Sequence, residues 1–323
     1  MSEARTVIID TDPGIDDALA LALAWRSPEL AVRMVSTVAG NVDLEATTTN
    51  AGLLAELFDA PTDMPLYSGS TRPLKGPISD AEPFHGDDGL GGARAELIAA
   101  GLVARKSRKG AVRQIVSAAR ELGSALTIVA LGPLTNIAKA VRLDGEAMAG
   151  IGSLVIMGGA VRAPGNMSPA AEFNFYADAT AAAEVIGAGL PITLVPLDVT
   201  QQVRLTAAEL RGALGRRRDG EARAWRSMLS LVGDRHRTTG IALHDPLAMA
   251  VAMDPDLVDC ETVPLRVATD GIARGMTIED RRAHTVEARD GSPVQVAFKV
   301  DADAVRELVV SRVLRAEIGR AHV

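Results

Sequence analysis

The chain has 323 residues, of which 47% are hydrophobic and 23% charged, and its formal net charge is −7. This length and composition predict a globular protein with a sizeable core. The acidic balance excludes a nucleic-acid partner, because binding phosphate backbones requires a basic face.

The sequence also bears on compartment and membrane attachment. Cys260 is the single cysteine, so no internal disulfide framework is possible. Residues 1–6 lack the apolar core of a signal peptide. No apolar run reaches the roughly 18 residues that a membrane span needs. We therefore expect a cytoplasmic protein that has no membrane partner.

Short apolar runs alternate with longer helical patterns along the chain. In chain order, strands are expected at Thr6–Asp10, Val32–Val38, Leu126–Leu131, Ser153–Met157, Ile192–Leu197 and Val294–Val300. Helices are expected at Ile15–Arg26, Leu44–Phe58, Ala111–Glu121, Leu134–Val141, Thr180–Ile186, Pro246–Met253 and Ala302–Arg315. A long loop is expected at Ser68–Gly92 and a helical excursion at Thr206–Gly240.

This alternation of strands and helices predicts the α/β class. The strands are near-continuous apolar runs, as strands buried on both faces should be. We expect one domain over residues 1–323, with an open, mainly parallel, Rossmann-like sheet. Helices should cover both faces of this sheet, and inserted helices should lie over the active site.

Four carboxylates follow the first expected strand within eight residues: Asp10, Asp12, Asp16 and Asp17. Like charges this close repel one another, and a hard cation with oxygen ligands removes the conflict. The segment has no Cys or His, so Ca²⁺ or Mg²⁺ is favoured over a softer metal. Helix capping with solvated acids is the alternative, and it accounts more easily for one acid than for four.

Polar side chains also follow the other expected strands, and ligands bind beyond the carboxyl ends of the strands in open parallel sheets. Several polar loops therefore converge on one site. Glu172 and Asn174 are expected to share one side of an extended segment, where they would suit sugar hydroxyls. A satisfied loop network is the alternative. The polar residues that follow the second to fifth strands include Asn41, Thr135, Asn136, Asn166, Glu172, Asn174 and Asp198.

Three histidines are of interest. His244 and Asp245 precede Pro246 at the start of an expected helix, where Asp245 alone is accounted for as an N-cap. Histidine titrates near neutral pH and suits proton transfer, although a lone histidine is more often structural. His85 and His236 lie in polar segments and are ambiguous between a site and the surface.

Together these residues resemble the calcium-dependent nucleoside hydrolases of the inosine-uridine-preferring type. The signature D-T-D-P-G-x-D-D-A of that family stands at Asp10–Ala18. The resemblance covers nearly the whole chain in order. It continues at Ala39–Asn41, His85-Gly86, Gly132–Asn136, Met157–Gly159, Gly165-Asn166, Glu172–Asn174, His244–Pro246 and Arg274–Arg282.

The resemblance implies hydrolysis of the N-glycosidic bond of ribonucleosides to free base and ribose. It implies that Asp12 accepts a proton from a Ca²⁺-bound water and that His244 is the acid for the leaving base. Asp10 would orient its neighbours. It implies a small-molecule nucleoside as partner and a homo-oligomer, either a dimer or a tetramer. The implied Ca²⁺ ligands are Asp12, Asp17, Asp245 and the main-chain carbonyl of Leu131, and the implied substrate contacts are Asp16, Asn41, His85, Asn166, Glu172, Asn174 and His236.

Base preference and two rival functions stay open. Leu229–Thr239 has no Tyr or Phe, where some relatives carry base-selecting aromatics, so purine, pyrimidine or modified bases are all possible. A haloacid-dehalogenase-like phosphatase would also place an Asp nucleophile after the first strand, but the Asp16-Asp17 doublet fits it poorly. A non-catalytic nucleoside or sugar-binding protein is disfavoured by His244 and by the complete set of implied metal ligands.

Overall fold

The first strand shows how the core divides between the two faces of the sheet. In β1 (Arg5–Thr11), Val7 and Ile9 belong to one buried cluster and Ile8 to another. Successive side chains of a strand point to opposite faces, and all three of these are fully buried. The side chains of β5 (Leu126–Ala130) and β6 (Ser153–Met157) divide between the two clusters in the same way.

The computed structural model describes residues 4–235, 240–283 and 290–315.

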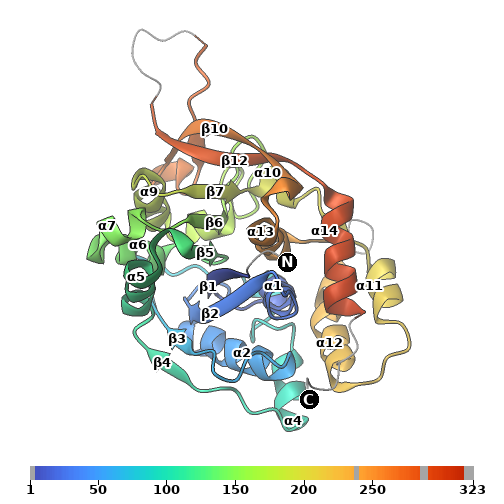
Figure 1. Cartoon of the computed structure of the whole chain (residues 1–323). Helices are drawn as coiled ribbons and strands as arrows, with labels where there is room; N and C mark the ends of the chain where they lie inside the picture. Colours follow the sequence, from blue (N-terminus) through green and yellow to red (C-terminus); the bar gives the residue numbers. More distant parts are fainter. Residues whose placement is uncertain (1–3, 236–239, 284–289, 316–323) are drawn as a thin grey trace.

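One ten-stranded sheet runs through the described part of the chain (Figure 1). Its order is β11-β10-β12-β7-β6-β5-β1-β2-β3-β4, and all neighbours from β12 to β4 are parallel. β10 runs antiparallel to both of its neighbours, β12 and β11. The remaining strands are β2 (Leu30–Thr37), β3 (Leu66–Ser68), β4 (Ser107–Lys109), β7 (Ile192–Val195), β10 (Val258–Val267), β11 (Thr277–Glu279) and β12 (Ser292–Val300). The mainly parallel α/β sheet expected from the sequence is confirmed.

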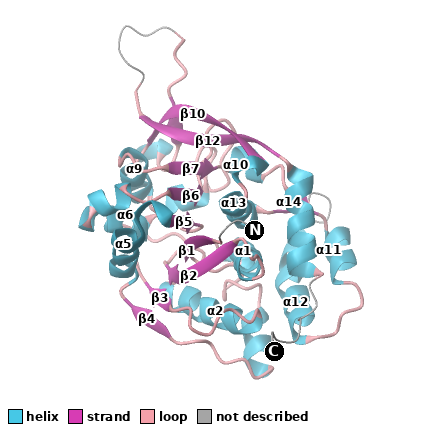
Figure 2. Cartoon of the chain, viewed as in Figure 1, coloured by secondary structure: helices cyan, strands magenta, loops and turns pink. Residues whose placement is uncertain are grey.

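Helices cover both faces of the sheet (Figure 2). The buried cluster on one face includes residues of α1 (Ile15–Trp25), α2 (Leu44–Leu57), α4 (Ala93–Ala99), α11 (Ala207–Leu214), α12 (Gly220–Arg235), α13 (His244–Met253) and α14 (Ala302–Val309). The buried cluster on the other face includes residues of α5 (Ala111–Leu122), α6 (Thr135–Leu143), α7 (Gly145–Ala149) and α9 (Ala179–Gly187). The short helices are α3 (Glu82–His85), α8 (Phe173–Ala177) and α10 (Leu197–Thr200).

Smaller elements complete the described chain. β8 (Arg204–Leu205) and β9 (Ile241–Ala242) form a separate antiparallel pair. Three 3₁₀ turns lie at Gly123–Ala125, Pro255–Leu257 and Gly271–Ala273, and a π turn lies at Val310–Leu314. The helical excursion expected at Thr206–Gly240 corresponds to α11 and α12.

The sheet is larger than the sequence indicated. β3 and β4 have three residues each, too few to establish a periodic pattern. Most residues of β10 are exposed or only half-buried, so this strand lacks the apolar run that marks the central strands. The loop expected at Ser68–Gly92 is interrupted by the single turn of α3.

A buried ion pair joins the two helices α1 and α12. Arg26, the residue that follows α1, donates to both carboxylate oxygens of Glu221 at 3.0 and 2.7 Å. Trp225 Nε1 donates to Glu221 Oε1 at 3.0 Å, and the Glu221 side chain is completely buried. Arg26 also donates to the carbonyl of Val313 at 2.9 Å. The C-terminal end of α1 is therefore fixed to two distant segments.

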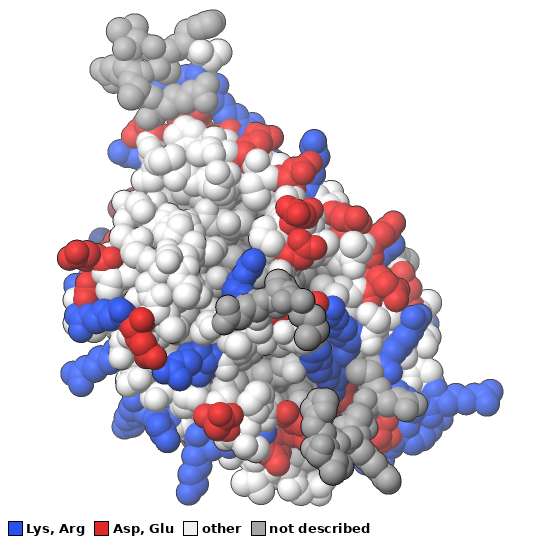
Figure 3. Space-filling view, viewed as in Figure 1, with Lys and Arg blue, Asp and Glu red and all other residues white. Residues whose placement is uncertain are grey.

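The surface agrees with the mixed composition. Acidic and basic side chains are interspersed over the face that Figure 3 shows. Among the described residues, every helix is too short or too polar to cross a membrane.

Candidate active site

The turn between β1 and α1 is held by its own acids. Asp17 Oδ2 accepts from the backbone nitrogen of Gly14 at 2.8 Å, and Asp17 Oδ1 accepts from the Thr11 hydroxyl. Asp10 lies within β1 and accepts from Ser36 Oγ at 2.5 Å and from Asn136 Nδ2 at 2.8 Å. These hydrogen bonds connect the turn to the ends of neighbouring strands, as the topology of a parallel sheet requires.

Asp12 occupies a narrow space between two glycines. Its Oδ2 accepts from the backbone nitrogen of Asn41 at 2.7 Å. A Cβ atom at Gly40 would overlap Asp12 Oδ2, and one at Gly132 would overlap Asp12 Oδ1. The Asn41 amide donates to the carbonyl of Asp12 at 3.0 Å and to Asp17 Oδ2 at 3.1 Å. The carboxylate of Asp12 is therefore fixed on both sides.

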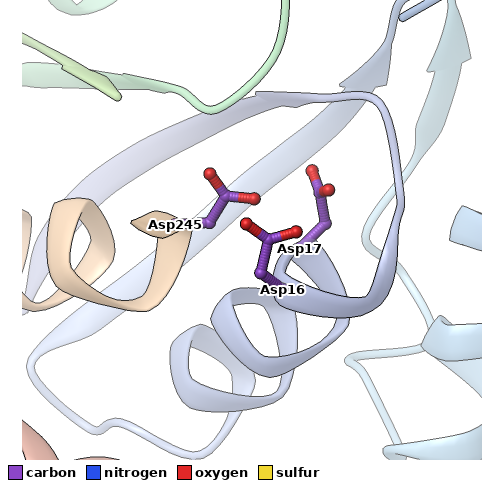
Figure 4. Close-up of side chains that lie close together, drawn as sticks. All are labelled: Asp16, Asp17 and Asp245. Atoms are coloured by element: carbon purple, nitrogen blue, oxygen red, sulfur yellow. The ribbon is translucent and has the colours of Figure 1, made fainter. Parts of the chain in front are cut away.

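Three acidic side chains meet beside this turn, and they come from two helices that are far apart in the sequence. Asp16 and Asp17 stand in the first turn of α1, and Asp245 stands in the first turn of α13. Figure 4 shows their carboxylates pointing toward one another, and one oxygen from each lies within 4.8 Å of the others. Because α13 begins at His244, Asp245 is its second residue rather than its N-cap. This group could hold a metal ion.

Asp16 therefore belongs to this group of three closely spaced carboxylates, and Asp12 does not. Burial and the charges of Asp17 and Asp16 raise the pKa of Asp12 well above its usual value. Burial raises the pKa of Asp16 and of Asp17 to about 6, and the charge of Asp16 also acts on Asp17. Burial and the neighbouring acids likewise raise the pKa of Asp245.

Four carboxylates with raised pKa values need a compensating positive charge to be ionised together at neutral pH. His85 Nε2 lies 3.9 Å from Asp16 Oδ1, but burial lowers the pKa of His85 to about 4, so this histidine does not supply that charge at neutral pH. Carboxylate and carbonyl oxygens without sulfur or imidazole suit a hard divalent cation. The donor set present here therefore fits such an ion.

A cavity of about 580 Å³ opens over the acidic group. Asp12 and Asp17 are fully buried and do not line it. The carbonyl of Leu131, another lining residue, accepts from Asn174 Nδ2 at 2.7 Å. His236 lies outside the described residues. The expected site residues that line the cavity are Asp16, Asn41, His85, Leu131, Asn166, Glu172, Asn174, His244 and Asp245.

The prediction that Glu172 to Asn174 form an extended segment is wrong. Glu172 is the N-cap of α8, and its side chain accepts from the backbone nitrogens of Asn174 at 2.8 Å and Phe175 at 3.1 Å. A carboxylate satisfies the free N–H groups of a helix start, so the segment turns into a helix. Gly159 also donates to Glu172, at 3.0 Å. Burial raises the pKa of Glu172 to about 7 despite these donors.

Two histidines line the cavity, and each uses Nδ1 in a hydrogen bond. The backbone nitrogen of Ile15 donates to His85 Nδ1 at 3.1 Å, and His244 Nδ1 lies 2.7 Å from Thr200 Oγ1. Burial lowers the pKa of His85 to about 4. It also lowers the pKa of His244 to about 4, with smaller effects from the charges of Arg204 and His85. Both rings are therefore neutral at neutral pH.

The loop that carries Asn166 is fixed by Asp198. The carboxylate of Asp198, in α10, accepts from the backbone nitrogens of residues 161, 162 and 163 at 2.9, 2.7 and 3.1 Å. The Arg162 side chain contacts Glu261 and Glu279 on the edge strands at 2.8 and 3.0 Å. Asn166 Oδ1 then accepts from the backbone nitrogen of Phe173 at 2.9 Å.

Sequence reasoning missed several members of the site. Thr200 is buried at the end of α10, and nothing in its local sequence indicates a contact with His244. Gln201 and Arg204 follow the fifth expected strand, so the rule that polar residues after the strands form the site could have found them. The missed residues that line the cavity include Asp80, Phe84, Met167, Gln201, Arg204 and Ile241.

This geometry can be compared with known proteins. The family model described as "inosine-uridine preferring nucleoside hydrolase" matches residues 7–307. The chain belongs to this family. This nucleoside hydrolase is therefore an enzyme, and its acidic group matches the metal dependence of the family.

Individual relatives agree over nearly the full length. The nucleoside hydrolase is 36% identical to uridine nucleosidase 1 of Arabidopsis thaliana, over 98% of this chain and 95% of that protein. It is 37% identical to the non-specific ribonucleoside hydrolase RihC of Salmonella agona, over 96% of this chain and 97% of that protein. The solved plant nucleoside hydrolase PpNRh1 superimposes with a TM-score of 0.87 and 36% identity, covering 97% of this chain and 99% of that one.

Proposed function

We propose that this enzyme hydrolyses the N-glycosidic bond of ribonucleosides to free nucleobase and ribose, as one domain spanning residues 1–323. The observation that carries the proposal is the buried acidic group at a cavity lined by hydroxyl-binding side chains. The names of the two relatives, a uridine nucleosidase and a ribonucleoside hydrolase, support it. The family match over residues 7–307 and the continuous sheet support the single domain.

We assign the cation as Ca²⁺, held by Asp12, Asp17, Asp245 and the carbonyl of Leu131. Burial and mutual repulsion of these acids support a bound cation, because it would offset both. The choice of Ca²⁺ comes from the resemblance to the calcium-dependent nucleoside hydrolases. When bound, the ion would supply the positive charge that orients the ribose diol and lowers the pKa of the attacking water. Asp16 lines the cavity beside the ion site and is assigned to the ribose.

The ribose would lie against the polar wall of the cavity. Carboxylate oxygens accept from sugar hydroxyls, and side-chain amides both donate and accept, so this wall suits a pentose. Glu172 and Asn174 are held by α8, whereas Asn166 is held by the loop that Asp198 fixes. The residues assigned to ribose are Asp16, Asn41, Asn166, Glu172 and Asn174.

Hydrolysis builds positive charge on C1′ and the ring oxygen, as in other glycoside cleavages. The surrounding carboxylates would stabilise that charge. Asp12 would accept the proton of the attacking water. We assign His244 as the acid for the leaving base, acting as a hydrogen-bond donor from its ring N–H; general acids contribute roughly 10²–10⁴-fold. His85 and His236 are assigned to the neighbourhood of the base.

The proposal is tested by chromatography of a nucleoside panel incubated with and without a chelator. Base and ribose should be released, and the chelator should stop the release. Asp17→Ala should lower turnover by at least about 100-fold, because charge stabilisation by a metal is worth several kcal/mol. Asp63→Ala, at an exposed position, is the matched control and should leave turnover unchanged.

Unchanged turnover in folded Asp17→Ala would contradict the metal role. Phosphate release from phosphomonoesters with Mg²⁺ would favour the phosphatase, and nucleoside binding without product would favour a binding protein.

The family resemblance also supports a homo-oligomer in the cytoplasm. Light scattering of the purified enzyme should then give a mass twice or four times that of one chain.

A further inference from the structure

The position of His244 is fixed through one ring nitrogen. Its Nδ1 lies 2.7 Å from the hydroxyl of Thr200, and Thr200 is completely buried. His244 also lines the cavity. Because Nδ1 is occupied by this contact, Nε2 is the ring nitrogen left for a bound molecule.

The direction of this hydrogen bond follows from the protons available. A threonine hydroxyl has one proton to donate, and in the described part of the chain its one partner is His244 Nδ1. If Nδ1 carried the ring proton, the hydroxyl proton would be buried without an acceptor, which costs free energy. Thr200 therefore donates to Nδ1, and the ring proton resides on Nε2.

His85 has the same arrangement, and there the direction is unambiguous. Its Nδ1 accepts from the backbone nitrogen of Ile15, a group that can only donate. A neutral His85 must then carry its proton on Nε2. Two different donors, a main-chain amide and a hydroxyl, thus fix the same tautomer in the two histidines of this cavity.

The short helix α10 holds Thr200 firmly. The backbone nitrogen of Leu197 donates to the carbonyl of Gly159 at 3.0 Å, and that of Thr200 donates to the carbonyl of Pro196 at 3.1 Å. Asp198, in the same helix, accepts the three N–H groups of residues 161–163. On the histidine side, the backbone nitrogen of Leu243 donates to the carbonyl of Val203 at 2.8 Å. Hydroxyl and ring are therefore fixed relative to each other.

We propose that Thr200 is a positioning residue whose hydroxyl holds His244 in the tautomer that presents Nε2–H to the leaving base. This inference rests on the proposed function, since it places the base in front of His244. As the C1′–N bond breaks, its electron pair moves to the base, and a hydrogen bond from Nε2–H stabilises that charge. The opposite tautomer would present a lone pair and repel it.

The tautomer can be observed directly by nuclear magnetic resonance. Long-range ¹H–¹⁵N correlation of the full chain, labelled in its five histidines and kept in Ca²⁺, distinguishes protonated from bare ring nitrogens. The spectrum of His244→Gln assigns the signals. We expect the proton on Nε2 in the wild type and in Thr200→Ser. In Thr200→Val, which keeps the shape and removes the hydroxyl, part or all of the signal should move to the other tautomer.

Kinetics give a second readout that a purely structural role would not produce. Thr200→Val should lower kcat on nucleosides by at least about tenfold, a part of the contribution expected of a general acid. Cleavage of 4-nitrophenyl riboside should change less than threefold, because its leaving phenolate needs no donor. Thr200→Ser should restore kcat on nucleosides. Thr47→Val, which removes another buried threonine hydroxyl in α2, is the control and should leave both rates unchanged.

Three results would overturn the proposal: a proton on Nδ1 in the wild type, an unchanged tautomer in Thr200→Val, or equal losses on both substrates. If Thr200→Val does not fold, the wild-type spectrum still decides. If the wild type releases no base from any nucleoside, the proposed function fails, while the spectra still test what Thr200 does to His244.

Discussion

Asp12 illustrates how single atoms determine this site. Gly40 and Gly132 flank its carboxylate so closely that neither position has room for a Cβ. Neither glycine has a positive φ, so an alanine there would be harmful through overlap with Asp12 and not through backbone strain. The glycines of the family motifs therefore serve the neighbouring acid.

Gly40→Ala should displace Asp12 from its hydrogen bond with Asn41. Misplacing a catalytic group by about 1 Å can cost about 100-fold, so we expect kcat/KM on nucleosides to fall by that order. The control is Gly187→Ala in α9, where an added Cβ would meet open space and φ is ordinary. Wild-type kinetics in Gly40→Ala would show that the position of Asp12 is not critical.

Glu172 should make stability depend on pH. Burial raises its pKa from 4.5 to about 7, so the folded state retains a proton that the unfolded state releases. This contribution is complete below pH 4.5 and is lost as the pH rises to about 7. Glu172→Gln cannot ionise, and its free energy of unfolding should fall less over this interval. Urea titrations at several pH values measure both slopes, and equal slopes would refute the assignment.

At the scale of helices, the pair between Arg26 and Glu221 fixes α1 behind the acids that it carries. Glu221→Ala should cost roughly 3–5 kcal/mol, because it leaves a largely buried guanidinium without its partner. The pair Arg33–Glu121 is the control, since its side chains are 53% and 56% exposed. Glu121→Ala should cost at most about 1 kcal/mol. Denaturant unfolding compares them, and similar losses would contradict this reasoning.

The sequence predicted those elements whose side chains are buried on two faces. The apolar runs of β1, β5 and β6 are visible because both of their faces pack in the core. β10 faces solvent over most of its length, so its pattern is weak. At the site, the acids of the first turn stood out because their repulsion needs an explanation. Thr200 did not, because its contact with His244 spans 44 residues and depends on tertiary structure alone.

At the scale of the whole molecule, the sheet gathers into one place residues that are far apart in sequence. A ligand that binds only the folded state stabilises it, by about 2.7 kcal/mol when its concentration is about 100 times its Kd. Ca²⁺ should therefore raise the melting temperature of chelator-treated enzyme in a concentration-dependent way. Asp17→Ala should respond weakly or not at all. An equal shift in both proteins, measured by calorimetry, would mean that the ion binds elsewhere.

The acidic group draws on both α1 and α13, and this has a consequence for biosynthesis. A ribosome exposes Asp16 and Asp17 early, but Asp245 emerges only after most of the chain has been translated. Until then the nascent polypeptide has no complete site for an ion. A chain truncated before α13 would therefore lack one of the three carboxylates of this group, whatever the rest of it folded into.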